Sequence, residues 1–176
     1  ASAMNKTADQ LARDRTSFKV TLVFVKPLPI EEFRAFARGL GLAPTQNIVR
    51  GIDANGKPVT IGVPAIWARD KQGRLLIGQP VPGGEPFDTT ALARMTEGHN
   101  PIRVVGVIST DVILDSATHA KVRDDSRVYA VDIMEQVLTD LVQQRYPGVP
   151  TNKIKAWSSL LYPAMERTGI APKATP

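Results

Sequence analysis

The chain has 176 residues and a mass of 19.1 kDa, which is enough for one well-buried hydrophobic core and predicts a single domain. Its apolar runs are shorter than the roughly 18 residues of a membrane span, so membrane attachment is expected only through an anchor outside this chain. The chain has no cysteine, which excludes disulfides, thiolate chemistry and cysteine metal sites. Its net charge of +5 comes from Lys and Arg residues scattered among acidic ones, which predicts a mildly basic surface and no specific nucleic-acid partner.

The N-terminal stretch is polar and compatible with a helix, so residues 1–16 are predicted to connect the domain to whatever precedes it. The first four residues, Ala1 to Met4, resemble either a cloning remnant or the A-x-A vestige of a signal cleavage site. Together with the lack of cysteine, this favours an extracytoplasmic protein, either secreted or tethered to a membrane, with a cytoplasmic protein as the alternative.

The main domain is predicted over residues 17–150 and begins with a strand-helix-strand unit. Phe18 to Val25 combines β-branched and aromatic residues without a breaker, which predicts a strand. Pro29 suits the start of a helix over about 30–40, and 46–52 supplies the next strand. The apolar residues of that helix recur at spacings of three and four and should face the sheet; they are Phe33, Phe36, Ala37 and Leu40.

A β-rich insertion is predicted over about residues 53–87. Asp53 to Gly56 reads DANG, a strong hairpin turn, and 57–63 returns as the partner strand. A second hairpin is expected over 65–77, followed by an exposed Pro/Gly loop over 79–86. Asp88 then caps a short helix that ends near Glu97.

The stretch from Pro101 to Ile133 reads as strand, helix, strand. Residues 102–108 are β-rich and almost wholly apolar, which predicts a central strand. Ser109 or Thr110 is expected to cap a short amphipathic helix that ends near Arg123. Residues 127–133 alternate with period two and predict a second strand.

This block resembles the closing half of the subtilisin-propeptide type of ferredoxin-like domain. The shared phrase has the form acidic, x, Arg-Val-x-x-Val, acidic, and is matched by residues 125–132, DSRVYAVD. The resemblance implies a ferredoxin-like fold and a role as a protease inhibitor or folding chaperone. In that family the domain ends near the second strand and its tail enters a protease cleft, whereas here another helix follows.

The predicted fold class is α+β: a ferredoxin-like split β-α-β sandwich with a β-hairpin insertion and extra C-terminal helices. Residues 134–146 predict a helix with Val137, Leu138, Leu141 and Val142 on one face. Residues 151–176 are expected to form a C-terminal helical segment, interrupted by Pro163, and a tail that frays from Ala171.

No constellation of residues typical of catalysis, cofactor binding or metal binding is found in the sequence. His99 and His119 lack a second ligand at metal-site spacing and are expected in surface or capping roles. The DANG turn lacks the distant Glu of a calcium loop. The adjacent carboxylates at 124–125 are expected to face water from a turn, and those at 132 and 135, three positions apart, are not expected to form a catalytic pair. Neither a phosphate loop nor a nucleophile elbow is present.

Four large side chains are candidates for an interface, with burial in the core as the alternative; they are Trp67, Trp157, Leu161 and Tyr162. We therefore expect a non-enzymatic, extracytoplasmic protein-interaction or assembly module that binds a protein partner or itself. The alternatives are a propeptide-like protease inhibitor or folding chaperone, and a small hydrolase with an unrecognised site.

Overall fold

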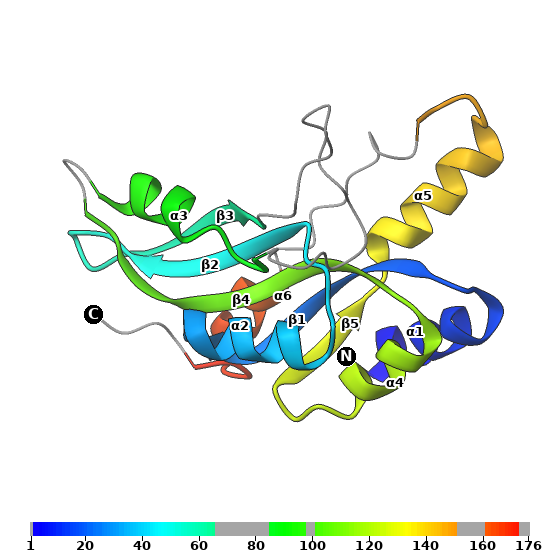
Figure 1. The fold of residues 1–176 in the computed structure, drawn as a ribbon, viewed down its shortest axis with the longest axis horizontal. Helices are drawn as coiled ribbons and strands as arrows, with labels where there is room; N and C mark the ends of the chain where they lie inside the picture. Colours follow the sequence, from blue (N-terminus) through cyan, green and yellow to red (C-terminus); the bar gives the residue numbers. More distant parts are fainter. Residues whose placement is uncertain (1, 66–84, 98–100, 151–160, 173–176) are drawn as a thin grey trace.

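The computed structural model describes residues 2–65, 85–97, 101–150 and 161–172 (Figure 1). The helices and strands in these ranges are, in chain order, α1 (Ser2–Asp14), β1 (Phe18–Leu28), α2 (Ile30–Gly39), β2 (Gln46–Ile52), β3 (Pro58–Pro64), α3 (Thr89–Thr96), β4 (Arg103–Leu114), α4 (Ser116–Arg123), β5 (Val128–Asp132), α5 (Met134–Arg145) and α6 (Leu161–Arg167). Most of the predicted second hairpin, the Pro/Gly loop up to residue 84, His99, and the start of the last helical segment lie outside the described residues.

The strands form one five-stranded sheet in the order β3-β2-β4-β1-β5, and every adjacent pair is antiparallel. This combination of helices with an antiparallel sheet confirms the α+β class. The first predicted hairpin is confirmed as β2 and β3. At its turn the Asp53 carboxylate accepts hydrogen bonds from the amides of Asn55 and Lys57, at 2.9 and 2.8 Å, and Gly56 adopts a φ of 77°.

The first face of the sheet carries the main hydrophobic core. Helices α1 to α4 all contribute buried side chains to it, together with alternate residues of the strands. Phe24 of β1 lies edge-on to Phe33 and Phe36 of α2, with ring centroids 6.1 and 5.4 Å apart. The helical face predicted for residues 30–40 is therefore confirmed as the face that covers the sheet.

The opposite face of the sheet is covered by α6. Tyr162, Met165 and Ala171 form a second buried cluster with side chains from β1, β4 and β5. Figure 1 shows α6 on the opposite side of the sheet from α2. The described part of the C-terminal segment therefore packs on its own chain, and Ala171, where the tail was predicted to fray, is buried.

The helix predicted to start at Ser109 or Thr110 is wrong in its N-terminal half. Both residues lie in β4, which continues to Leu114 because it pairs with β1 on one side and β2 on the other. The helix is only α4, and its cap is Asp115, whose carboxylate accepts from the Thr118 amide at 2.7 Å. Tertiary pairing thus outweighs the local capping signal.

The segment expected to be a connector forms α1, which packs beside β5 and α4 (Figure 1). Ala8 and Ala12 are buried there, and Leu11 is half-buried against the core. The Asn5 side chain accepts a hydrogen bond from the amide of Val131 at 3.1 Å. Since β5 is an edge strand, this bond satisfies a backbone donor that no neighbouring strand reaches.

Candidate functional site

Helix α5 is amphipathic in the reverse of the usual sense. Its buried side chains are polar, because Gln136 and Thr139 are only 7% and 6% exposed. Its exposed side chains are large and apolar, since Met134, Leu138 and Leu141 are 60%, 36% and 58% exposed. Surface helices of globular proteins normally turn the apolar stripe toward the core. We call the surface formed by Met134, Leu138 and Leu141 the outer face of α5.

Polar bonds hold α5 in this orientation. The Gln136 side-chain oxygen accepts from the backbone amide of Lys19 at 2.9 Å, and the Lys19 ammonium lies 3.5 Å from the Glu135 carboxylate. On the same side, the Asp140 carboxylate lies 2.8 Å from the Arg15 guanidinium and accepts from the Gln136 side-chain amide at 2.8 Å. Because these groups would lose their partners if the helix rolled over, the apolar stripe stays on the outside.

The predicted apolar face of this helix is divided between the interior and the surface. Val137 packs partly against the main core and Val142 is half-buried, whereas Leu138 and Leu141 are exposed. Beyond the helix, Tyr146 and Val149 are also exposed, and Figure 1 shows the C-terminal half of α5 projecting away from the sheet. An exposed apolar surface of this kind is typical of a contact with another molecule.

The predicted interface residues are not those of the outer face of α5. Trp67 and Trp157 are outside the described residues. Tyr162 is buried beneath α6, and Leu161 is half-buried beside the same cluster. Burial raises the pKa of the Tyr162 hydroxyl to about 12, against a smaller opposing influence of the Arg50 charge. A role of these residues in an interface stays a prediction. The exposed residues of α5 were not predicted to form an interface.

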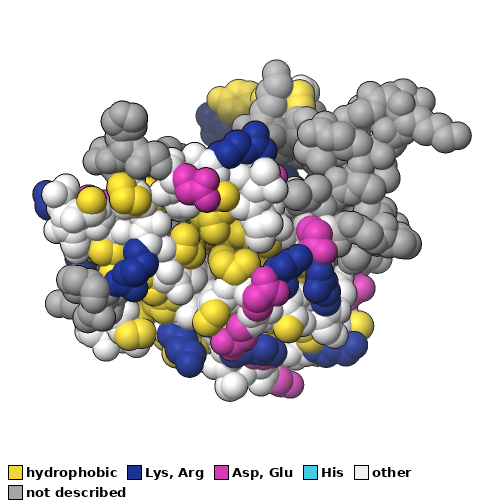
Figure 2. All heavy atoms as spheres, turned by 60° about the vertical axis from the view of Figure 1, so that its left-hand side comes forward, with side chains coloured by type: hydrophobic (Ala, Val, Ile, Leu, Met, Phe, Trp, Pro, Cys, Tyr) yellow, Lys and Arg dark blue, Asp and Glu magenta, His cyan; other side chains and the backbone are white. Residues whose placement is uncertain are grey.

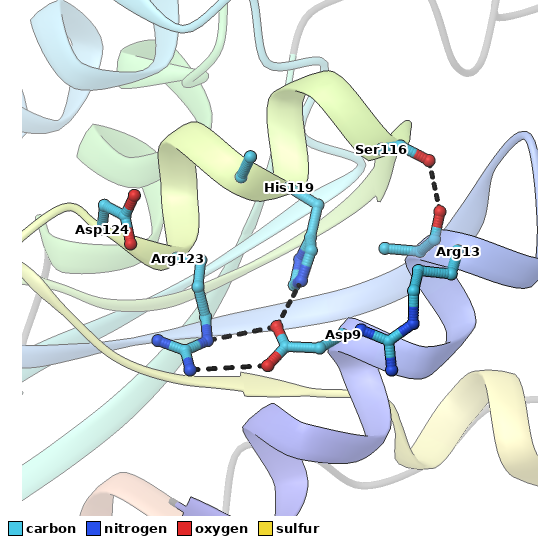
Figure 3. Close-up of a pocket in the computed structure, with 8 residues that line it drawn as sticks. Asp9, Arg13, Ser116, His119, Arg123 and Asp124 are labelled. Carbon is cyan, nitrogen blue, oxygen red and sulfur yellow. Dashed lines mark hydrogen bonds and ion pairs between the residues drawn. The ribbon is translucent and has the colours of Figure 1, made fainter.

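A hollow of ≈ 400 Å³ lies between α1 and α4 (Figure 3). The Asp9 carboxylate points into it from α1, where one oxygen lies 3.0 Å from His119 Nε2 and 3.2 Å from Arg123 Nε. Arg13 and Asp124 also line the hollow. Burial acts to raise the pKa of Asp9, but hydrogen bonds from His119 and Arg123 outweigh it and hold that pKa below its ordinary value.

The predicted surface role of His119 is wrong, because its side chain is buried and lies edge-on to Phe18 at 5.6 Å. Its partner Asp9 is 110 positions away in the chain, so local spacing could not reveal the pair. The second ring nitrogen, Nδ1, is buried without a hydrogen-bond partner among the described residues. A general base needs a nitrogen within reach of its substrate. The arrangement therefore ties α1 to α4 and offers neither nitrogen for acid-base chemistry.

The other carboxylates considered from the sequence also have structural partners. Asp125 pairs with the Arg127 guanidinium at 2.6 Å, and that guanidinium lies over the Phe36 ring at 4.7 Å. Asp132 is buried, which raises its pKa, while its bond from the Met134 amide partly opposes the shift. The DSRVYAVD phrase thus contributes to a turn and to packing.

Charges of both signs are interspersed over much of the face drawn in Figure 2. Among the ion pairs of the described residues, the Glu85 carboxylate lies 2.7 Å from Arg34 and 2.6 Å from Arg38. Within the described ranges, no group of three or more metal-ligating side chains converges. In the same ranges no helix is both long and apolar enough to cross a bilayer.

No protein-family model, curated protein or solved structure matches the chain.

Proposed function

We propose that this protein is a non-enzymatic protein-interaction or assembly module whose docking surface is the outer face of α5. The observation that carries the proposal is the inverted amphipathicity of this helix, with polar residues bonded underneath and large apolar residues outside. Water-exposed Leu and Met side chains gain free energy when a partner covers them. An apolar helix face fits a groove or another amphipathic helix.

We also propose that the fold is a ferredoxin-like sandwich, because the strand order suits one. Leaving out the added edge strand β3, the order β5-β1-β4-β2 is that of two interleaved β-α-β units, with α2 and α4 on one face. The propeptide-like inhibitor is less well supported. After β5 the chain enters α5 directly at Met134, so no free tail leaves the domain at that point.

We place the module outside the cytoplasm, on the ground that it has no cysteine. The non-enzymatic assignment is supported by two carboxylates that could otherwise act as a general acid or base. Asp9 and Asp125 are each paired with an arginine side chain of the same chain. In both cases the partners are fixed by packing of the chain itself.

A photo-reactive amino acid at Leu141, introduced in cells that naturally make the protein, tests the proposal. We expect a covalent adduct from this position and none from Lys121, an exposed position on α4 that serves as the control. Mass spectrometry then identifies the partner, whether it is another protein or the same chain. If Leu141 gives no adduct while the protein is folded and abundant, the outer face of α5 is not a docking surface.

A further inference from the structure

We propose that the outer face of α5 binds the same face of a second copy of the chain, as an antiparallel pair of helices. The inference rests on the proposed function, because it names the partner of that surface. Along the outer side of the helix lie Met134, Leu138, Leu141 and Arg145, at successive spacings of four, three and four. These are the spacings of a coiled-coil seam, in which two helices pack at a shallow angle.

The row of these four side chains, Met134 to Arg145, is here called the stripe. It is complementary to itself only when the second helix runs in the opposite direction. An axis of two-fold symmetry midway between Thr139 and Asp140 places Leu138 of each copy against Leu141 of the other. The same axis places Met134 against the aliphatic stem of Arg145. The two leucines then form the centre of the contact, where exclusion of water contributes most.

Electrostatics favour the antiparallel direction over the parallel one. Arg145 is the charged residue of the stripe and lies in the last turn. Parallel helices would bring the two Arg145 guanidinium groups together, whereas antiparallel helices separate them and place each near the first turn of the other copy, which contains Glu135. Asp140 stays out of the contact because it lies on the inner side, paired with Arg15. Antiparallel helices also align their dipoles favourably.

The size of the contact predicts a weak dimer. A pair of twelve-residue helices buries less than the ~1,200 Å² of a standard stable interface, so a dissociation constant of about 10–100 µM is expected. The exposed Tyr146 and Val149 adjoin the end of the stripe and can extend the contact. Association at this strength would depend on local concentration and would suit an assembly built from several contacts.

Two measurements on the full purified chain test the pairing. The first is light scattering from about 10 µM to about 1 mM, a range that spans the expected dissociation constant. The apparent mass should rise from 19.1 kDa toward twice that value, and Leu141→Lys should abolish the rise while Lys121→Glu, on α4, should not. Circular dichroism confirms that each variant is folded.

The second measurement is disulfide formation between introduced cysteines. No native thiol competes with them, because the chain has no cysteine of its own. Antiparallel pairing predicts that a mixture of Met134→Cys and Arg145→Cys chains gives a linked dimer. Either variant alone should form no disulfide-linked dimer, because identical positions lie about 16 Å apart along the antiparallel helices. Crosslinking of either variant alone would show parallel pairing and overturn the antiparallel contact. A concentration-independent monomer would overturn self-pairing, whereas an adduct to a different protein from Leu141 would still support the proposed docking function.

Discussion

The Arg50 guanidinium on β2 and the Glu166 carboxylate on α6 form a buried ion pair that ties the C-terminal helix to the sheet. Arg50 Nε donates to one carboxylate oxygen at 3.0 Å, its Nη2 donates to the other, and its Nη1 donates to the Thr60 hydroxyl at 2.8 Å. The two side chains are only 6% and 10% exposed. The pair therefore fixes α6 over the second face of the sheet by a bidentate contact that is largely shielded from water.

Removing one member of this pair should strongly destabilise the docking of α6. Arg50→Met leaves the Glu166 carboxylate buried without its counter-charge, which is expected to cost about 3–5 kcal/mol of unfolding free energy. The double variant Arg50→Met with Glu166→Met should recover much of this loss, because no unpaired charge remains. Urea denaturation measures the unfolding free energy of the single and double variants. A double variant at least as unstable as the sum of the single ones would show that the pair is not acting as a unit.

The sequence predicted the regular part of the fold because its local signals agree with the tertiary structure. In α2, the spacing of Phe33 and Phe36 and the preceding Pro29 lead to the observed helix. In β4 the local signals conflict with the tertiary structure. Ser109 and Thr110 favour a helix N-cap, but the strands on both sides hold them in the sheet. A signal that depends on neighbours distant in the chain could not be found in the local pattern.

The candidate site was harder to predict for the same reason. The apolar residues of α5 were recognised, yet their periodicity says only that they share a face, not which way the face points. The direction is set by contacts of Gln136 and Asp140 with Lys19 and Arg15, more than a hundred positions away in the chain. The polar residues between the apolar ones, read together with their long-range partners, carry that information.

Replacing Asp9 should loosen α1 without unfolding the sheet. Asp9→Asn weakens the contacts to His119 and Arg123, so amide hydrogen exchange in α1 should become about two- to fivefold faster, as expected for partly exposed ion pairs. Asp14→Asn is the matched control, because within the described part of the chain that carboxylate accepts its hydrogen bond from Gln10 of its own helix. Equal acceleration by both variants would show that α1 responds to its own charge rather than to the link with α4.

Acid should have the same effect on α1 as Asp9→Asn. Because the pKa of Asp9 is held below its ordinary 3.8, its contribution to stability is complete above that pH and is lost as the pH falls through the folded-state pKa. Hydrogen exchange in α1 of the wild type should therefore accelerate at acid pH relative to the Asn variant. An identical pH profile for both proteins would contradict this assignment.

Asp132 should show the opposite pH dependence. Its pKa is raised by burial, so the folded protein retains a proton that the unfolded chain has already released. This relative stabilisation is complete below pH 3.8 and is lost as the pH rises through the folded-state pKa, leaving a buried charge at neutral pH. Asp132→Asn keeps an oxygen that can accept from the Met134 amide. The variant should therefore raise the melting temperature at pH 7 and leave it unchanged at pH 3, with Asp124→Asn, on the surface, as the control.

Gly106 should be the least replaceable glycine of the sheet. It lies in β4 where the register with β2 shifts, its φ is 156°, and an added Cβ would lie 2.4 Å from the carbonyl oxygen of Leu28. That atom belongs to the backbone of the adjacent strand and cannot move aside, so Gly106→Ala should cost about 2–4 kcal/mol in urea denaturation. Gly39→Ala is the control, because a Cβ there meets nothing within 4 Å and alanine favours the end of α2. If both substitutions were equally mild, the close approach of β4 to Leu28 would not constrain the fold.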